Sequence, residues 1–95
     1  MTAFVGCAEV TIYCPGCFSL KDKRRVIQSL LDRLRSQFNV SAAEVGHQDQ
    51  HRRASLAFTT VSSSHRQTSR MLDRIEQELS GDPALQIREW NRRIL

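Results

Sequence analysis

Apolar and polar residues alternate along the first stretch of the chain, from Ala3 to Cys14. Apolar Ala8, Val10, Ile12 and Cys14 fall on one parity, and Glu9, Thr11 and Tyr13 fall between them. A period of two places successive side chains on opposite faces of a strand, so this pattern predicts a strand with one buried face. Pro15-Gly16 follows and ends the strand.

The next segment changes to a helical period. Spacings of three and four residues predict a helix over Leu20–Phe38, whose apolar positions are Leu20, Ile27, Leu30, Leu31, Leu34 and Phe38. Ser19 precedes it as a candidate N-cap, and Asp22 is placed to interact with the positive end of the helix. Asn39 fits the left-handed position that often ends a helix.

The rest of the chain contains two short strand patterns, a second helix and a last strand. We expect strands over Val40–Gly46 and Ala54–Val61 joined by the polar connection His47–His51, a helix over about His65 to Leu79, and a strand over Leu85–Leu95. In this last strand Leu85 and Ile87 fall on one parity and Trp90 and Ile94 on the other, which predicts a bulge or a frayed end.

This order of elements predicts an α+β, ferredoxin-like βαββαβ fold in a single domain, residues 1–95. Two helices cover one face of a four-stranded antiparallel sheet, and right-handed crossovers give the strand order 4-1-3-2. We also expect three turns to meet at one end of the molecule: Cys14–Ser19, His47–His51 and Ser80–Pro83.

Composition narrows the class of protein. The chain is 40% hydrophobic and 25% charged, which is ordinary for a globular domain. It contains no apolar window of membrane-spanning length and no basic start of a signal peptide, and its three cysteines lack a disulfide framework. We therefore expect a cytoplasmic protein with no membrane partner.

Two stretches resemble the YlxP-like family of small bacterial proteins, and the likeness in length and element order extends over essentially the whole chain. They are Ser19–Arg24 and Asn39–Glu44, the second followed by Gln48-Asp49. The resemblance implies a ferredoxin-like plan. Family genes often lie beside genes for transcription-elongation and translation-initiation factors, which implies a connection with RNA or the ribosome. The chain departs from the family pattern at His51, Cys14, Cys17, Arg88, Arg92 and Arg93.

The formal charge of +4 favours anionic partners. Lys21, Lys23, Arg24 and Arg25 lie in the first turns of the predicted helix, where cations oppose the helix dipole. An anion there would meet both free backbone N–H groups and basic side chains. We therefore expect a non-catalytic module that contacts RNA or a ribosomal particle through these four residues, with Arg53 as a further candidate.

An alternative explains the same cluster as a solvated helix face in which Asp22 pairs with Arg25.

A second functional hypothesis is a metal- or thiol-dependent regulator. Cys14-Pro15-Gly16-Cys17 before a helix has the spacing that lowers a thiol pKa in redox enzymes. Addition of His47 and His51 completes a set suited to tetrahedral zinc. Ordinary core packing of the cysteines competes with both.

The face of the predicted sheet without helices suggests a further partner. On its two central strands Tyr13 is the one outward aromatic residue, so stacking of RNA bases in the manner of RNA-recognition motifs is not expected. Small apolar residues there favour a homodimer, or a purely dimerising structural protein; they are Ala43, Val45, Ala57 and Val61.

An acylphosphatase would need an arginine in Cys14–Ser19, which has none. We expect no catalytic residues and no cofactor.

Overall fold

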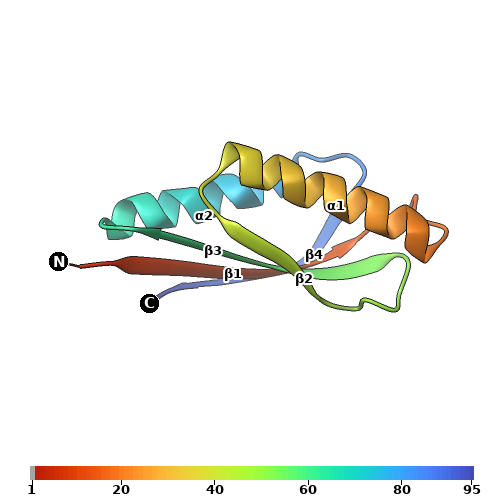
Figure 1. Cartoon of the computed structure of the whole chain (residues 1–95), viewed down its shortest axis with the longest axis horizontal. Helices are drawn as coiled ribbons and strands as arrows, with labels where there is room; N and C mark the ends of the chain where they lie inside the picture. The colour runs from red at the N-terminus through yellow and green to blue at the C-terminus, as the bar shows by residue number, and fades with distance from the viewer. Residues whose placement is uncertain (1) are drawn as a thin grey trace.

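The six secondary-structure elements occur in the predicted order in the computed structural model, which describes residues 2–95 (Figure 1). They are β1 (Phe4–Tyr13), α1 (Leu20–Gln37), β2 (Ser41–Gly46), β3 (Arg53–Ser62), α2 (His65–Ser80) and β4 (Gln86–Ile94). The strands form one antiparallel sheet with the order β2-β3-β1-β4. Read from the other edge this is the predicted order 4-1-3-2, so the α+β, ferredoxin-like βαββαβ prediction is confirmed.

Both helices cover the same face of the sheet, and the core lies between the two layers (Figure 1). Inward residues of β1 and β3 meet the apolar stripes of the helices, because period-two strands and period-3.6 helices each present one apolar face. α2 covers the end of the sheet at which the two chain termini lie, and α1 covers the opposite end. Neither helix in residues 2–95 is long and apolar enough to cross a membrane.

Two bulges adjust the edge strands. In β4 the register with β1 shifts so that Thr11 pairs with Glu89 but Ile12 pairs with Ile87, which leaves Arg88 as the extra residue. This confirms the predicted bulge and lets Ile87 and Trp90 both pack against the core. In β2 the register skips Val45 in the same way, and its side chain is exposed.

The ends of α1 confirm one prediction and correct another. Ser19 is the N-cap: its Oγ accepts a hydrogen bond from the backbone N–H of Asp22 at 3.0 Å, and the Asp22 carboxylate accepts one from the N–H of Phe18 at 3.1 Å. The prediction of a left-handed Asn39 was wrong, because His47 is the one non-glycine residue with positive φ in residues 2–95. The buried Phe38 is the C-cap in an extended conformation and leads the chain directly toward β2.

The three predicted turns lie toward one end of the molecule, and two of them are in direct contact. The backbone N–H of Cys14 donates to the carbonyl of Arg52 at 2.7 Å, which joins the first turn to the β2–β3 connection. The third turn, Ser80–Pro83, leads to the same end, because Gln86 a few residues later pairs with Tyr13 beside the Cys14–Cys17 turn. Its Asp82 forms an ion pair with Arg33 at 3.0 Å, and Arg33 lies 13 residues after Leu20, about 20 Å along the axis of α1. α2 therefore ends beside the middle of α1.

Candidate anion-binding groove

An open groove of about 940 Å³ lies between the outer face of α1 and β2, which is the edge strand of the sheet. Residues three and four apart on α1 share this face, so charged side chains from several turns of the helix line the same groove. They include Lys21, Arg24, Arg25, Asp32 and Arg35, and the polar Gln28 lies among them. We call this surface the α1–β2 groove.

Three cations at one end of the α1–β2 groove carry uncompensated charge. Lys21, Arg24 and Arg25 are exposed, and none of them forms an ion pair within residues 2–95. The alternative that pairs Asp22 with Arg25 is wrong, because the Asp22 carboxylate instead accepts the backbone N–H of Phe18. The groove therefore presents three free positive charges to solvent.

The other end of the groove is held in place by Arg35. Its guanidinium donates to the carbonyl of Ala42 at 2.5 Å and lies 3.5 Å from the Asp32 carboxylate. These contacts tie the last turns of α1 to the first residues of β2. They also neutralise part of the charge of Arg35, so the excess positive charge of the groove is concentrated at the start of the helix.

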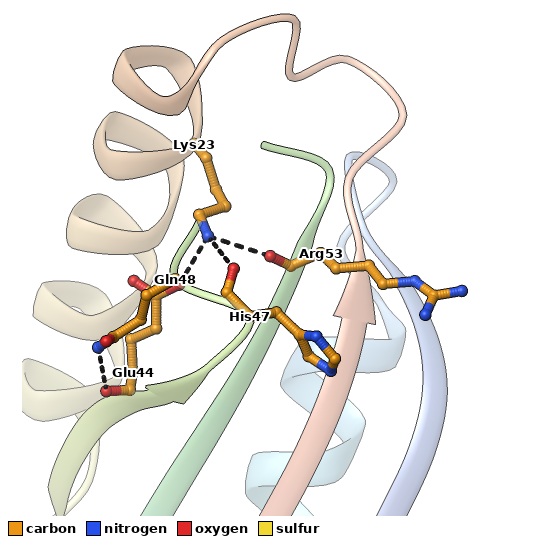
Figure 2. A network of polar contacts seen from close by, with 5 residues as sticks. All are labelled: Lys23, Glu44, His47, Gln48 and Arg53. Atoms are coloured by element: carbon orange, nitrogen blue, oxygen red, sulfur yellow. Dashed lines mark hydrogen bonds and ion pairs between the residues drawn. The ribbon is translucent and has the colours of Figure 1, made fainter. Parts of the chain in front are cut away.

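Lys23, the fourth predicted anion ligand, is buried rather than exposed. The residue is 1% exposed, and its ammonium donates to the carbonyls of His47 at 2.8 Å and Arg53 at 3.1 Å (Figure 2). The Glu44 carboxylate lies 2.9 Å from the same nitrogen. Two protons of the ammonium are thus donated to backbone carbonyls, and the carboxylate adds an ion pair. The prediction that Lys23 lies among the exposed cations was therefore wrong.

The helical period contained the signal for the burial of Lys23. Lys23 precedes Ile27 by four residues and lies on the same stripe as Leu30 and Leu34, all of which are buried. A lysine on the apolar face of a helix must find acceptors or snorkel to solvent. Here Glu44 and two carbonyls of the β2–β3 hairpin supply the acceptors, which only the tertiary structure could place.

Arg53, the further candidate, lies apart from the groove. Its backbone carbonyl binds Lys23, whereas its side chain points the other way, toward the sheet face that the helices leave open (Figure 2). There Arg53 lines a small hollow with Tyr13 and His51. The structure therefore brings together Lys21, Arg24 and Arg25 but neither Lys23 nor Arg53.

The predicted zinc ligands do not form a ligand cluster. Cys14 and Cys17 are 4% and 0% exposed beneath the start of α1, whereas His51 is exposed in the β2–β3 connection. No three His, Cys, Asp or Glu side chains in the described part of the chain are close enough together to hold a metal ion. The metal form of the regulator hypothesis therefore has no site among these residues.

The two cysteines of the Cys14–Cys17 turn do contact each other, and their sulfur atoms are 2.7 Å apart. Burial raises the pKa of Cys17 from its ordinary value of 9.0 to about 12, and the hydrogen bond and charge of Cys14 act in the same direction. Cys17 is therefore a protonated thiol at neutral pH, the opposite of the activated thiolate that the redox interpretation invoked.

The open face of the sheet has the predicted composition. Along its central strands Glu9 pairs with Ala57 and Thr11 with Ser55, while Tyr13 lies opposite Arg53. Tyr13 is itself covered, because the guanidinium of Arg88 lies 4.8 Å from the centre of its ring. The one outward-facing aromatic ring on these two strands is thus already stacked within the protein.

The amino-acid sequence of this chain is similar to those of a known protein family. The family described as "Protein of unknown function (DUF503)" matches residues 5–92. The chain belongs to the DUF503 family. A relative of this DUF503 chain, the uncharacterized protein YlxP of Bacillus subtilis (strain 168), is 40% identical over 86 residues that cover 90% of each protein. The YlxP-like resemblance of the sequence is therefore confirmed.

A solved structure supports the fold of this DUF503 chain without bearing on its function. The de novo designed protein Foldit4 superposes with a TM-score of 0.58 over 99% of this chain and 97% of the design, at 14% sequence identity. Because a designed protein reaches the same arrangement with an almost unrelated sequence, the fold alone carries no information about a ligand.

Proposed function

We propose that this DUF503 protein is a non-catalytic module that binds the phosphate backbone of RNA through the α1–β2 groove. The supporting observation is the group of three exposed, unpaired cations, Lys21, Arg24 and Arg25, on one wall of the groove. Their charges oppose the dipole at the start of α1, so they are retained at a cost to helix stability that an anionic ligand would remove.

Binding of this kind is expected to be largely independent of base sequence. Lysine and arginine contacts to phosphate fix position and orientation but do not read bases. Stacking on aromatic rings is the usual way to select single-stranded bases, and Tyr13 is occupied by Arg88. A ribosomal particle, which exposes RNA backbone, is a suitable target for such a module.

The polar residues near the groove favour binding over catalysis. Glu44 and His47 are the nearest candidates for acid–base work, yet the Glu44 carboxylate is engaged by Lys23, and the backbone of His47 belongs to the same network. No nucleophile, base and orienting group can be assembled from these contacts. This supports a role without chemistry.

The salt dependence of RNA affinity tests the proposal. We expect the slope of log K against log salt for a short single-stranded RNA to become shallower by about two in the variant Lys21→Ala, Arg24→Ala, Arg25→Ala, because each lost contact removes about 0.7 from the slope. Fluorescence anisotropy at salt concentrations from about 50 to 300 mM measures the affinity for RNA, and the slope follows from these affinities.

A charge-matched control separates the groove from general attraction. The variant Arg66→Ala, Arg70→Ala, Arg74→Ala also removes three exposed cations that form no ion pair within residues 2–95, but from α2. It should keep the wild-type slope. Equal slopes in wild type and both variants, or an equal loss in both variants, would reject the groove as the binding surface.

We also propose that the protein forms a homodimer through the open face of the sheet. Val61 and Leu95 are large exposed apolar residues, and Val61 lies on this face opposite Val5. Glu9 and Arg93 on the same face offer complementary charges to a two-fold related copy. Sedimentation equilibrium, which separates a 10.9 kDa monomer from a dimer, checks this prediction.

A further inference from the structure

We propose that Cys14 and Cys17 form a reversible intramolecular disulfide, so that the turn between β1 and α1 is a site of dithiol oxidation. The Sγ atoms are 2.7 Å apart, whereas a disulfide bond is about 2.0 Å long. The two sulfurs therefore need to move by less than 1 Å relative to each other for the bond to form.

The backbone of the turn already has the geometry of a disulfide-bridged pair. The N–H of Cys17 donates to the carbonyl of Cys14 at 3.2 Å, which closes a β-turn around Pro15-Gly16. Such a turn brings its first and fourth Cα atoms within 7 Å, the range that a disulfide requires. The proline fixes one dihedral angle of the turn, which reduces the number of competing conformations.

Contacts on both sides hold the turn in this state. The N–H of Cys14 donates to the carbonyl of Arg52 at 2.7 Å, and the Arg52 guanidinium donates to the carbonyl of Cys17 at 3.3 Å. On the far side Ser19 caps α1, so the helix begins three residues after Cys17. The fold thus keeps the two sulfurs together, whereas the unfolded chain would have to bring them together at a cost in entropy.

The oxidation is written as exchange with a low-molecular-weight disulfide. The thiolate of Cys14 attacks one sulfur of RSSR, giving a Cys14–S–S–R mixed disulfide and RS⁻. Cys17 then loses its proton and attacks the Cys14 sulfur, which forms the Cys14–Cys17 bond and releases the second RS⁻. Two thiols lose two protons and two electrons, and the small disulfide is reduced to two thiols.

Burial makes this reaction slow but does not oppose it at equilibrium. Both side chains are nearly inaccessible, and the pKa of Cys17 is raised to about 12, so little thiolate is available at neutral pH. The proximity of the two sulfurs instead shifts the equilibrium between dithiol and disulfide toward the disulfide. We therefore expect slow oxidation of the folded protein that nevertheless goes to completion under conditions too reducing for the unfolded chain.

Thiol counting over a range of oxidised to reduced glutathione tests the proposal without any RNA. The variant Cys7→Ser leaves Cys14 and Cys17 as the remaining cysteines. The protein is equilibrated with each glutathione mixture, quenched with acid and alkylated in denaturant. The intact mass should show two alkyl groups in the most reducing mixtures and none in the most oxidising ones. The midpoint ratio of oxidised to reduced glutathione should be about tenfold lower for folded than for urea-unfolded protein.

A second variant provides the control. Cys14→Ser keeps Cys7 and Cys17, and it should retain both alkylatable thiols over the same range. Circular dichroism confirms that each variant is folded. The proposal is overturned if folded Cys7→Ser keeps two thiols at ratios that oxidise the unfolded chain, or if its midpoint equals or exceeds that of the unfolded chain.

Discussion

The buried ammonium group of Lys23 has three partners, and all of them come from the β2–β3 hairpin. Two are backbone carbonyls, those of His47 and Arg53, and the third is the Glu44 carboxylate (Figure 2). A buried charge is tolerated only when it is paired and hydrogen-bonded. One side chain thus joins the first turns of α1 to the hairpin at the end of the molecule that carries the proposed groove.

Removal of this cation should be strongly destabilising. Lys23→Met keeps the apolar stem but leaves the Glu44 carboxylate and two carbonyls without their donor, a loss that costs about 3–5 kcal/mol in buried pairs. Lys21→Met, two residues earlier and exposed, should stay within about 0.5 kcal/mol of wild type. Urea unfolding followed by circular dichroism gives both values, and similar stabilities for the two variants would contradict this assignment.

The buried thiol of Cys17 makes a pH prediction with a definite sign. Its pKa is about 12 in the folded protein and 9.0 as its ordinary value, so above pH 9 the unfolded chain loses a proton that the folded chain retains. The free energy of unfolding of the reduced protein therefore falls as pH rises from 9 to 12, with a slope approaching about 1.4 kcal/mol per pH unit.

The same measurement on Cys17→Ala isolates this contribution. The variant lacks the titrating group, so its stability should depend less steeply on pH over the same window. Parallel curves for wild type and variant between pH 9 and 12 would show that Cys17 ionises equally in both states.

At the scale of single residues, the sequence located the charges but not their surroundings. Lys21, Arg24 and Arg25 were predicted as exposed cations, and they are. Lys23 differs from them only by its place on the apolar stripe of the helix, and its acceptors lie more than twenty residues away in the chain. Such partners depend on the register of β2 and β3, which local patterns do not specify.

Among the elements, β1 and α2 approach each other closely at Gly6. A Cβ at Gly6 would lie 2.7 Å from Cγ2 of Thr68 and 3.0 Å from Cδ1 of Leu72. Gly6 has no positive φ, so the requirement for glycine here is space alone. This contact sets the distance of α2 from the sheet at the end of the molecule opposite the groove.

Gly6→Ala should therefore destabilise the protein by about 1–3 kcal/mol through overpacking. Gly16→Ala is the matched control, because a Cβ at Gly16 would meet no atom within 4 Å and its φ is not positive. That substitution should be neutral or stabilising by up to about 1 kcal/mol. Thermal unfolding of the two variants provides the comparison, and an equal loss in both would indicate that the β1–α2 spacing is adjustable.

Patterns within an element predicted that element well. The opposite parities of Ile87 and Trp90 required an extra residue between them, and Arg88 is that residue. Asn39 shows the limit of such inference, because an amide that suits a left-handed helix end is equally suited to a loop. The burial of the preceding Phe38 determined the path of the chain instead.

At the scale of the whole molecule, the two ends of the sheet differ. The end near the chain termini is covered by α2, and the other end combines α1, the Cys14–Cys17 turn and the Lys23 network (Figure 1). Strand order and topology followed from element order. The position of each helix along the sheet did not, which is why Ser80–Pro83 lies farther along α1 than the other two turns and why Arg53 was grouped with cations that it does not adjoin.

The most direct test of the proposed function locates the RNA on the protein. In a ¹⁵N–¹H NMR titration with a short single-stranded RNA, the largest amide shifts should fall on the first turns of α1 and on β2, over residues 20–28 and 41–46. Open-face residues of β1 and β4 should change little. Shifts centred on that open face, or none at concentrations that saturate binding, would contradict the account.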